Sequence, residues 1–348
     1  MAALDKIFRT AIQYKASDLY ISSGVKPVLR INGDLVLIEE HPVLTKKMAE
    51  DYLLEILTDE QKADFAKELD LDFSLDSPTI SRFRVNLYVH RKGISAAFRI
   101  IPENVLTLEE LGLPEQLARI KDFNNGLVLV TGSTGSGKST TLSAIVNDIN
   151  QNLPEHIITI EDPIEFVHQN AKSVIEQREV GNHTLSFERA LKSALREDPD
   201  VILVGEMRDI ETIKLAITAA ETGQLVLATL HTNGAAKAVD RIIDAFPTEQ
   251  QNQVRMQLSE TLRCVVWQTL LKTKDGKGRV SALEILFNNT GVANMIRKGK
   301  THQIPSAIET GSREGMQTMK KSITDLLESD LISEETAIAN MPEEFDAS

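Results

Sequence analysis

The sequence predicts an α/β protein in which a mixed α+β domain is followed by a domain built on a parallel sheet. Short alternating strands and two helices follow one another up to about residue 101. From about residue 115, apolar strands alternate with helices, which is the order that a doubly wound parallel sheet requires. A glycine-rich turn directly follows the first of those strands and marks a ligand site at the strand ends.

The first domain is expected to span residues 1–101. Its helices are expected at about 3–15, 46–57 and 59–69, with Thr45 and Thr58 as N-caps of the last two. Its strands are short: residues 17–21, 28–31, 35–38, 70–75, 82–89 and 94–101. Asn32-Gly33-Asp34 separates two of them and is a strong hairpin signal.

Residues 102–114 are expected to form a linker, because Pro102 ends the last strand. The second domain then spans 115–348. Its buried parallel strands are expected at 128–130, 157–160, 201–204 and 226–230. A long helix is predicted over 249–271, with Thr248 as its N-cap, and helices follow from about 290, the last capped by Ser333.

Composition excludes several classes of function. The 348 residues carry a net charge of −13, which argues against broad nucleic-acid binding. The one cysteine, Cys264, excludes an intrachain disulfide and a zinc site of several cysteines, and we expect it to be buried in the long helix. The chain shows no apolar run of membrane-spanning length and no signal peptide, so we expect a cytoplasmic protein that reaches a membrane only through partners.

The glycine-rich turn after the first parallel strand fits the phosphate-binding P-loop pattern G-x-x-x-x-G-K-[ST]. Its glycines let the backbone take positive φ, so that amide N–H groups surround an anion at a helix N-terminus. Lys138 places a charge on the β- and γ-phosphates, and the Ser139 hydroxyl is placed to bind Mg²⁺. The expected nucleotide-binding residues are Gly132, Ser133, Thr134, Gly135, Ser136, Gly137, Lys138, Ser139 and Thr140.

Carboxylates follow two of the other apolar strands. Glu161 and Asp162 directly follow the strand 157–160. These two carboxylates could hold Mg²⁺ through water or polarise a nucleophile, and the alternative is a solvated loop without a catalytic role. Glu206 ends the strand 201–204, and Gly205 precedes it where P-loop ATPases usually have an aspartate. We therefore expect Glu206 to orient the attacking water.

A histidine and a group of arginines are further candidates. His231 follows the strand 226–230 and either contacts the γ-phosphate or is structural. Arg82 and Arg84 share one face of their strand, and Arg99 lies on the next strand. Arginines on a rigid sheet can bind the phosphates of a neighbouring copy, while local ion pairs are the alternative.

In their order along the chain, these motifs resemble the secretion ATPase superfamily, which drives type II and type IV secretion and type IV pili. The resemblance covers nearly the whole chain. Stretches such as 82–86, 193–200, 205–209 and 315–318 resemble the ATPases that retract type IV pili. The resemblance implies a PAS-like N-terminal domain, a RecA-like C-terminal domain with a helical extension, and a homohexameric ring that binds ATP between subunits.

The resemblance also implies roles for residues and partners. Arg84 and Arg99 match arginines that approach the nucleotide from an N-terminal domain, and His231 matches a family histidine. The implied function is an ATP-driven motor for pilus retraction and twitching motility, peripheral at the inner membrane. Its implied partners are the platform protein of the pilus and an accessory retraction ATPase.

Two departures from the family pattern bear on this reading. The chain lacks the four-cysteine zinc element and the longer N-terminal region of assembly and secretion ATPases, which favours retraction. The retraction ATPases usually carry a short helix with the sequence Ala-Ile-Arg-Asn-Leu-Ile. The corresponding residues of this chain are 291–296, where Ala293 takes the place of the arginine. An accessory or assembly ATPase, and an adaptor that binds ATP with little turnover, therefore stay open as alternatives.

Overall fold

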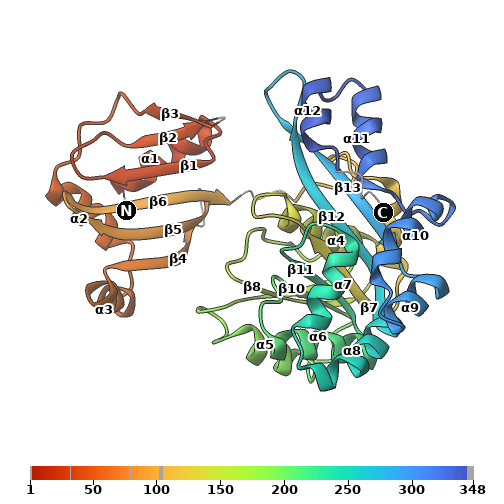
Figure 1. Cartoon of the computed structure of the whole chain (residues 1–348). Coiled ribbons are helices and arrows are strands. Elements are labelled where there is room, and N and C mark those ends of the chain that lie inside the picture. The colour runs from red at the N-terminus through yellow and green to blue at the C-terminus, as the bar shows by residue number, and fades with distance from the viewer. Residues whose placement is uncertain (1, 32, 78–79, 102–104, 343–348) are drawn as a thin grey trace. The chain divides into compact units, whose positions relative to one another are not determined.

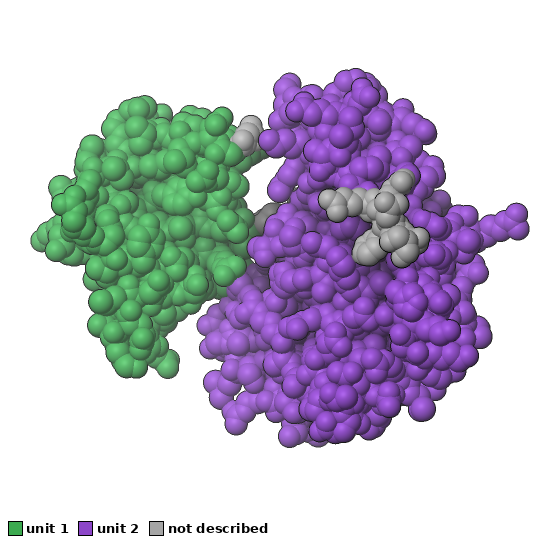
Figure 2. All heavy atoms as spheres, in the orientation of Figure 1, with its two compact units in different colours: residues 1–104 green, residues 105–348 purple. Residues whose placement is uncertain are grey.

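The computed structural model describes residues 2–31, 33–77, 80–101 and 105–342, and it confirms the predicted α/β class (Figure 1). The chain divides into two compact units, residues 1–104 and 105–348 (Figure 2). The predicted linker residues 102–104 lie outside the described residues, as do Asn32 of the predicted hairpin and the C-terminal residues 343–348.

The first unit is a six-stranded antiparallel sheet in the order β3-β2-β1-β6-β5-β4. Its strands are β1 (Asp18–Ser22), β2 (Val28–Ile31), β3 (Asp34–Leu37), β4 (Asp70–Ser77), β5 (Ser81–His90) and β6 (Gly93–Ile101). Its helices are α1 (Ala2–Gln13), α2 (Lys46–Glu55) and α3 (Asp59–Glu68). The elements predicted for this part of the chain are therefore present, with ends shifted by at most two residues.

Alternation along β5 separates the core of the first unit from its open face. Phe83 and Val85 are fully buried, and Phe83 stacks on Phe8 with ring centroids 4.3 Å apart. Arg82 and Arg84 alternate with these residues and so point to the opposite face, on one side of the strand as predicted.

The two predicted N-caps of the first unit are confirmed. Thr45 accepts a hydrogen bond from the backbone of Met48, and Thr58 forms a reciprocal capping box with Gln61. These contacts satisfy backbone N–H groups that a helix start otherwise leaves unpaired.

The second unit is built on a seven-stranded sheet in the order β13-β12-β7-β11-β10-β8-β9. Its strands are β7 (Gly126–Thr131), β8 (His156–Glu161), β9 (Val174–Glu179), β10 (Val201–Val204), β11 (Leu225–Leu230), β12 (Leu262–Lys272) and β13 (Arg279–Phe287). Neighbouring strands are parallel except for β13, which runs antiparallel to β12. The four predicted parallel strands are confirmed as β7, β8, β10 and β11.

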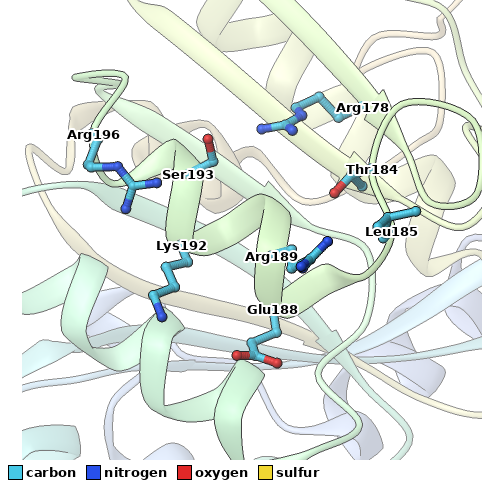
Figure 3. A pocket seen from close by; sticks show the side chains of 8 residues that line it. All are labelled: Arg178, Thr184, Leu185, Glu188, Arg189, Lys192, Ser193 and Arg196. Atoms are coloured by element: carbon cyan, nitrogen blue, oxygen red, sulfur yellow. The ribbon is translucent and has the colours of Figure 1, made fainter.

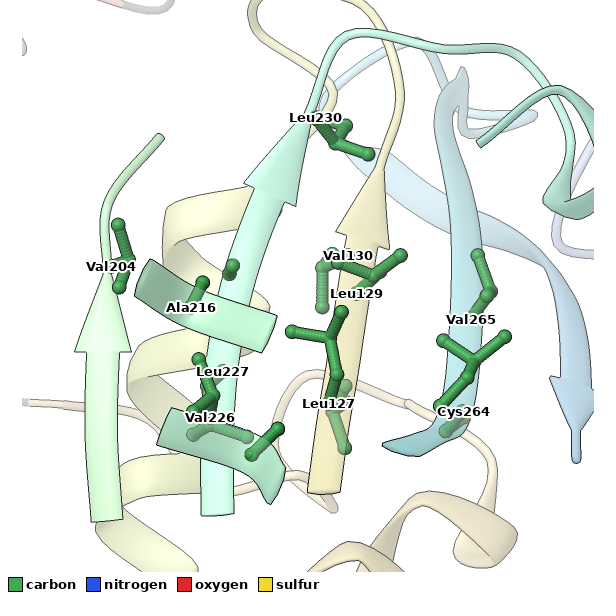
Figure 4. Packing of buried hydrophobic residues seen from close by; sticks show 14 of the residues in the cluster. Leu127, Leu129, Val130, Val204, Ala216, Val226, Leu227, Leu230, Cys264 and Val265 are labelled. Atoms are coloured by element: carbon green, nitrogen blue, oxygen red, sulfur yellow. The ribbon is translucent and has the colours of Figure 1, made fainter. Parts of the chain in front are cut away.

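The helices of the second unit complete the expected doubly wound pattern. Those between the strands are α4 (Lys138–Asn152), α5 (Phe187–Ala194), α6 (Ile210–Thr222), α7 (Ala235–Asp244) and α8 (Thr248–Thr261). Those after the sheet are α9 (Thr290–Arg297), α10 (Ile304–Thr310), α11 (Met319–Glu328) and α12 (Glu334–Asn340), and Ser333 caps α12 as predicted. Short 3₁₀ helices are η1 (Glu115–Asp122), η2 (Thr301–Gln303) and η3 (Ser312–Glu314). The apolar strands β7, β11 and β12 lie side by side in the core, with Ala216 of α6 packed against them (Figure 4).

The predicted helix over 249–271 is wrong in its second half. Helix α8 ends at Thr261, and residues 262–272 form the strand β12, which pairs with both β7 and β13. The N-cap prediction is also wrong, because Pro247 is the N-cap residue and Thr248 is already helical. Cys264 is therefore buried in the sheet and not in a helix.

The segment before the second sheet packs as part of the second unit. Leu113 is buried in its core, and Leu108 and Leu111 pack against that core. Residues 105–113 thus belong structurally with the sheet that follows them.

Candidate nucleotide-binding and catalytic site

The P-loop connects β7 to α4 by a turn that requires glycine at two places. Gly132 and Gly137 have φ values of +144° and +87°, in the region that favours glycine. A Cβ atom at Gly132 would lie 2.3 Å from the backbone oxygen of Gln268, and one at Gly137 would lie 2.7 Å from its side-chain nitrogen. The glycines therefore let the loop close against β12.

Lys138 is buried inside this loop. Its Nζ donates to the backbone oxygens of Gly132 and Ser133, each at 2.9 Å. Burial lowers the pKa of the Lys138 ammonium, while the nearby carboxylates of Glu206 and Glu165 raise it. The ammonium is thus held by the loop, with two carboxylates near it, where phosphates would bind.

Gln268 of β12 holds the P-loop from the neighbouring strand. Its Nε2 donates to the backbone oxygen of Ser136 at 2.7 Å, and its Oε1 accepts from the Thr141 hydroxyl at 2.6 Å. The side chain is 2% exposed. Sequence reasoning missed this contact because it placed Gln268 in a helix; the β-branched and apolar run Cys264-Val265-Val266 was the available signal for a strand.

Glu206 lies directly after β10 and binds two side chains. Its carboxylate contacts the Arg208 guanidinium at 2.7 Å and His231 Nε2 at 3.1 Å. The hydrogen bond from Arg208, with the charge of that guanidinium, lowers the pKa of Glu206, so the group is a carboxylate at neutral pH. The structure therefore brings two predicted residues, Glu206 and His231, into contact and adds Arg208, which sequence reasoning did not single out.

Strand order explains why these groups meet. Strand β11 lies between β7 and β10, so the P-loop, Glu206 and His231 follow three adjacent parallel strands. The Thr229 hydroxyl donates to the Gly205 backbone oxygen, and Gly205 N donates to the Ile160 oxygen at 2.8 Å. The absence of a side chain at Gly205 lets this segment approach β8 closely.

Glu161 ends β8, the strand next to β10, and its carboxyl group is held by two side chains. Its Oε1 accepts from the Thr159 hydroxyl at 2.6 Å and from Gln177 Nε2 at 3.2 Å. Burial raises the pKa of its carboxyl group. The carboxylates that raise the pKa of the Lys138 ammonium are those of Glu206 and Glu165.

Arg84 and Arg99 lie in the first unit, directly opposite each other in the register of β5 and β6. Arg99 Nε donates to the Asp18 carboxylate at 3.0 Å. Within the part of the chain that the structure describes, Arg84 has no ion pair. Like charges directly opposite in a sheet are destabilising, so Arg84, the member of the pair without an ion pair, favours contact with an anion.

A nucleotide and Mg²⁺ fit the polar groups of the second unit. Among the described residues, the Ser136 and Thr232 hydroxyls are buried without a partner. The Ser139 hydroxyl accepts and donates no bond among those residues, and no group of three His, Cys, Asp or Glu side chains there could hold a metal by itself. Such a donor set suits Mg²⁺, which takes most of its ligands from phosphates and water.

A parallel sheet that joins a P-loop, its lysine and a strand-end glutamate defines a P-loop NTPase. Residues 1–339 match the family model described as "Type II/IV secretion system protein". The chain belongs to this family, and it is a P-loop ATPase.

Similar proteins support this family assignment over nearly the full length of the chain. The chain is 51% identical over 332 residues to the "Type IV pilus retractation ATPase PilT" of Pseudomonas aeruginosa, covering 95% of this chain and 96% of the relative. It is 53% identical to a "Twitching motility protein" of Neisseria gonorrhoeae, covering 89% of this chain and 83% of the relative. The crystal structure of "the Pilus Retraction Motor PilT and Bound ADP" matches with a TM-score of 0.91 and 42% identity, covering 97% of each chain.

In the described part of the chain, no helix has both the length and the apolar character needed to span a membrane.

Proposed function

We propose that this chain is the ATP-hydrolysing motor that retracts type IV pili and so powers twitching motility. The main observation in favour of ATP hydrolysis is the position of the Glu206 carboxylate, which lies beside His231 and near Lys138 of the P-loop. The role in pilus retraction is supported by similarity, over nearly the full length of the chain, to a protein named for pilus retraction.

Each candidate site residue of the second unit has a proposed role in ATP hydrolysis. Lys138 and the P-loop amides bind the phosphates, and Ser139 would hold Mg²⁺, which supplies charge neutralisation at the β- and γ-phosphates when bound. Glu206 accepts a hydrogen bond from the attacking water, and His231 fixes the glutamate and contacts the γ-phosphate. Glu161, whose carboxyl group Thr159 and Gln177 hold at the end of β8, would hold Mg²⁺ through water or polarise the attacking water.

The remaining proposals concern assembly. Arg84 and Arg99 reach a nucleotide in a homohexameric ring, in which the units 1–104 and 105–348 act as the two moving domains. The ring works in the cytoplasm at the inner membrane, on the pilus platform protein and beside an accessory retraction ATPase. It has no nucleic-acid partner.

The first test is ATP hydrolysis by the purified protein, with its mass read by light scattering in the same sample. Glu206→Gln should bind ATP with unchanged affinity and lose about 10²–10⁴-fold in turnover, because the water loses its acceptor. Glu260→Gln, on the exposed surface of α8, is the matched control and should turn over normally. Normal turnover in Glu206→Gln would refute the role of this residue, and ATP binding without turnover in the unmodified protein would favour the adaptor.

One observation favours a second candidate, an accessory pilus ATPase. Ala293, half-buried on α9, replaces the arginine that the retraction ATPases usually have. Deletion of the gene separates the candidates: surface pili without twitching indicate the retraction motor, retained twitching with reduced force indicates an accessory ATPase, and absence of pili indicates assembly.

A further inference from the structure

Side chains engage both carboxylate oxygens of Glu206, the residue proposed to orient the attacking water. Its Oε2 lies 2.7 Å from Arg208 Nη2, and its Oε1 lies 3.1 Å from His231 Nε2. The hydrogen bond from Arg208 is the largest of the influences that lower the pKa of Glu206. A carboxylate bound by a guanidinium accepts a proton less readily, and its oxygen is less available to a water molecule. The contact with Arg208 therefore opposes the role that hydrolysis requires of Glu206.

The Arg208 side chain can move while the backbone on either side of it stays fixed. Met207 is buried, and its N–H donates to the backbone oxygen of Thr229 at 3.2 Å. Asp209 is the N-cap of α6. The Arg208 side chain between them is 73% exposed, whereas that of Glu206 is 20% exposed. Breaking an ion pair at an exposed guanidinium costs little, so Arg208 can turn away from Glu206 by a rotation of its own side chain.

A second carboxylate, that of Asp162, lies close enough to act on the Arg208 guanidinium. Val204 of β10 pairs with Ile160 of β8, so the residues that follow these two strands leave the sheet next to each other. Glu206 raises the pKa of Arg208 most, and the charge of Asp162 raises it further. Asp162 is exposed and, among the described residues, has no ion pair of its own. It therefore offers a position to which the guanidinium can turn.

The other arginines of this part of the second unit belong to a different surface. Four basic side chains line a cavity of about 470 Å³ between β9, the loop that follows β9, and α5 (Figure 3): Arg178, Arg189, Lys192 and Arg196. Arg178 pairs there with Glu197 at 3.3 Å. In the part of the chain that the structure describes, none of these four side chains forms an ion pair with Glu206 or Asp162. Arg208 thus links those two carboxylates by its charge, and the cations of the cavity do not.

We propose that Arg208 is a positioning residue that exchanges between Glu206 and Asp162, and that ATP turnover proceeds when it lies on Asp162. In the first position the guanidinium restrains Glu206. In the second position one oxygen of Glu206 is free to accept a hydrogen bond from the attacking water, while His231 holds the other. The exchange needs the rotation of one exposed side chain, and each position pairs the guanidinium with a carboxylate. The inference rests on the role proposed for Glu206 and adds a restraint on that residue.

The test compares ATP turnover and ATP affinity in full-length variants. Arg208→Met keeps an unbranched side chain without the charge. It should raise kcat by ~3- to 10-fold with the ATP affinity unchanged in a nucleotide titration, because Glu206 regains its ordinary basicity. Asp162→Asn removes the second position of the guanidinium and should lower kcat by ~10-fold, again with the affinity unchanged.

Two further variants serve as controls. Arg208→Lys should give a kcat between those of Arg208→Met and the unmodified protein, because its ammonium keeps the charge but restrains Glu206 through a single point of contact. Arg313→Met makes the change from arginine to methionine at an exposed position of η3 and should turn over normally. Circular dichroism checks that each variant is folded.

The double variant decides whether the two residues act through each other. Arg208→Met with Asp162→Asn should turn over as fast as Arg208→Met alone, because Asp162 then has no guanidinium to receive. If Asp162→Asn slows turnover equally with and without Arg208, Asp162 acts by itself, for example on Mg²⁺, and the exchange is refuted. A fall in kcat in Arg208→Met would also overturn the inference, since Arg208 would then assist hydrolysis and not restrain Glu206.

Failure of this inference is distinct from failure of the proposed function. If Glu206→Gln turns over normally, the role proposed for Glu206 fails, and the restraint fails with it. If Glu206→Gln is inactive and Arg208→Met turns over like the unmodified protein, the role of Glu206 stands and Arg208 does not restrain it.

Discussion

At the scale of single residues, the P-loop depends on a side chain that lies 127 positions beyond it in the sequence, from Thr141 to Gln268. Replacing Gln268 by Met keeps the volume but removes both polar contacts, which leaves the Ser136 carbonyl and the Thr141 hydroxyl unpaired. We expect ATP affinity to fall ~10- to 100-fold, measured by nucleotide titration.

Thr141→Val is the matched variant, since it removes only one of the two contacts. Its loss of affinity should be the smaller, and its effect should largely disappear when Gln268 is already Met. Unchanged ATP affinity in both single variants would show that the P-loop keeps its shape without Gln268.

Another residue-scale prediction concerns His168, which packs on α4 behind the P-loop. Its Nε2 lies 3.2 Å from the Ser143 hydroxyl, and burial lowers the pKa of the imidazole to about 4. The folded state therefore favours neutral His168. This contribution to stability is complete above pH 6.5, the ordinary value, and is lost as pH falls from there toward about 4.

Between pH 7.5 and pH 5, the free energy of unfolding should fall by about 2 kcal/mol through this residue. Urea unfolding at the two pH values measures the change. His168→Gln should remove that part of the pH dependence; if the variant and the unmodified protein show equal falls, the histidine is not buried as neutral imidazole in solution.

At the scale of elements, β12 shows where local pattern and tertiary structure disagree. The segment 249–271 has helical apolar spacing in its first half, and α8 is indeed a helix. The second half becomes a strand because the edge of β7 offers backbone hydrogen bonds and buries its apolar residues. Whether the second half of this segment forms a helix or a strand therefore depends on β7, its neighbour in the sheet, which is distant in sequence.

Helix α7 provides an element-scale prediction. It follows the His231 loop, and no side chain from its own N-terminus caps it; instead the Glu284 carboxylate of β13 accepts from Ala235 N at 2.9 Å. Glu284→Leu should cost about 1–2 kcal/mol of stability and slow ATP turnover more than it weakens ATP binding, because the loop carrying His231 loses its anchor.

Glu284→Gln is the control for that prediction, since an amide oxygen can still accept the Ala235 bond. Chemical unfolding and steady-state kinetics on both variants supply the comparison. Equal turnover in the leucine variant and the unmodified protein would show that the His231 loop is held by other contacts.

At the scale of the whole molecule, Arg84 tests the proposed ring. Arg84→Ala should lower turnover by ~10³-fold with the fold intact, as removal of an arginine finger does. Mixing Arg84→Ala copies with Glu206→Gln copies should restore part of the activity if the arginine of one copy serves the glutamate of another. A mixture as inactive as its components would place both residues in the same copy or deny Arg84 this role.

The amino-acid sequence by itself determined the P-loop, the strand-end positions of Glu206 and His231, the first unit's elements and the caps at Thr45, Thr58 and Ser333. Each of these depends on residues close in sequence: glycine spacing, alternation along a strand, or a side chain next to a helix start. Only the tertiary structure decided that 262–272 is a strand, that Gln268 holds the P-loop, that Arg208 pairs with Glu206, and that Glu161 turns to Thr159 and Gln177. Those features depend on which strands become neighbours, and sheet pairing joins segments whose separation in the sequence leaves no local signal.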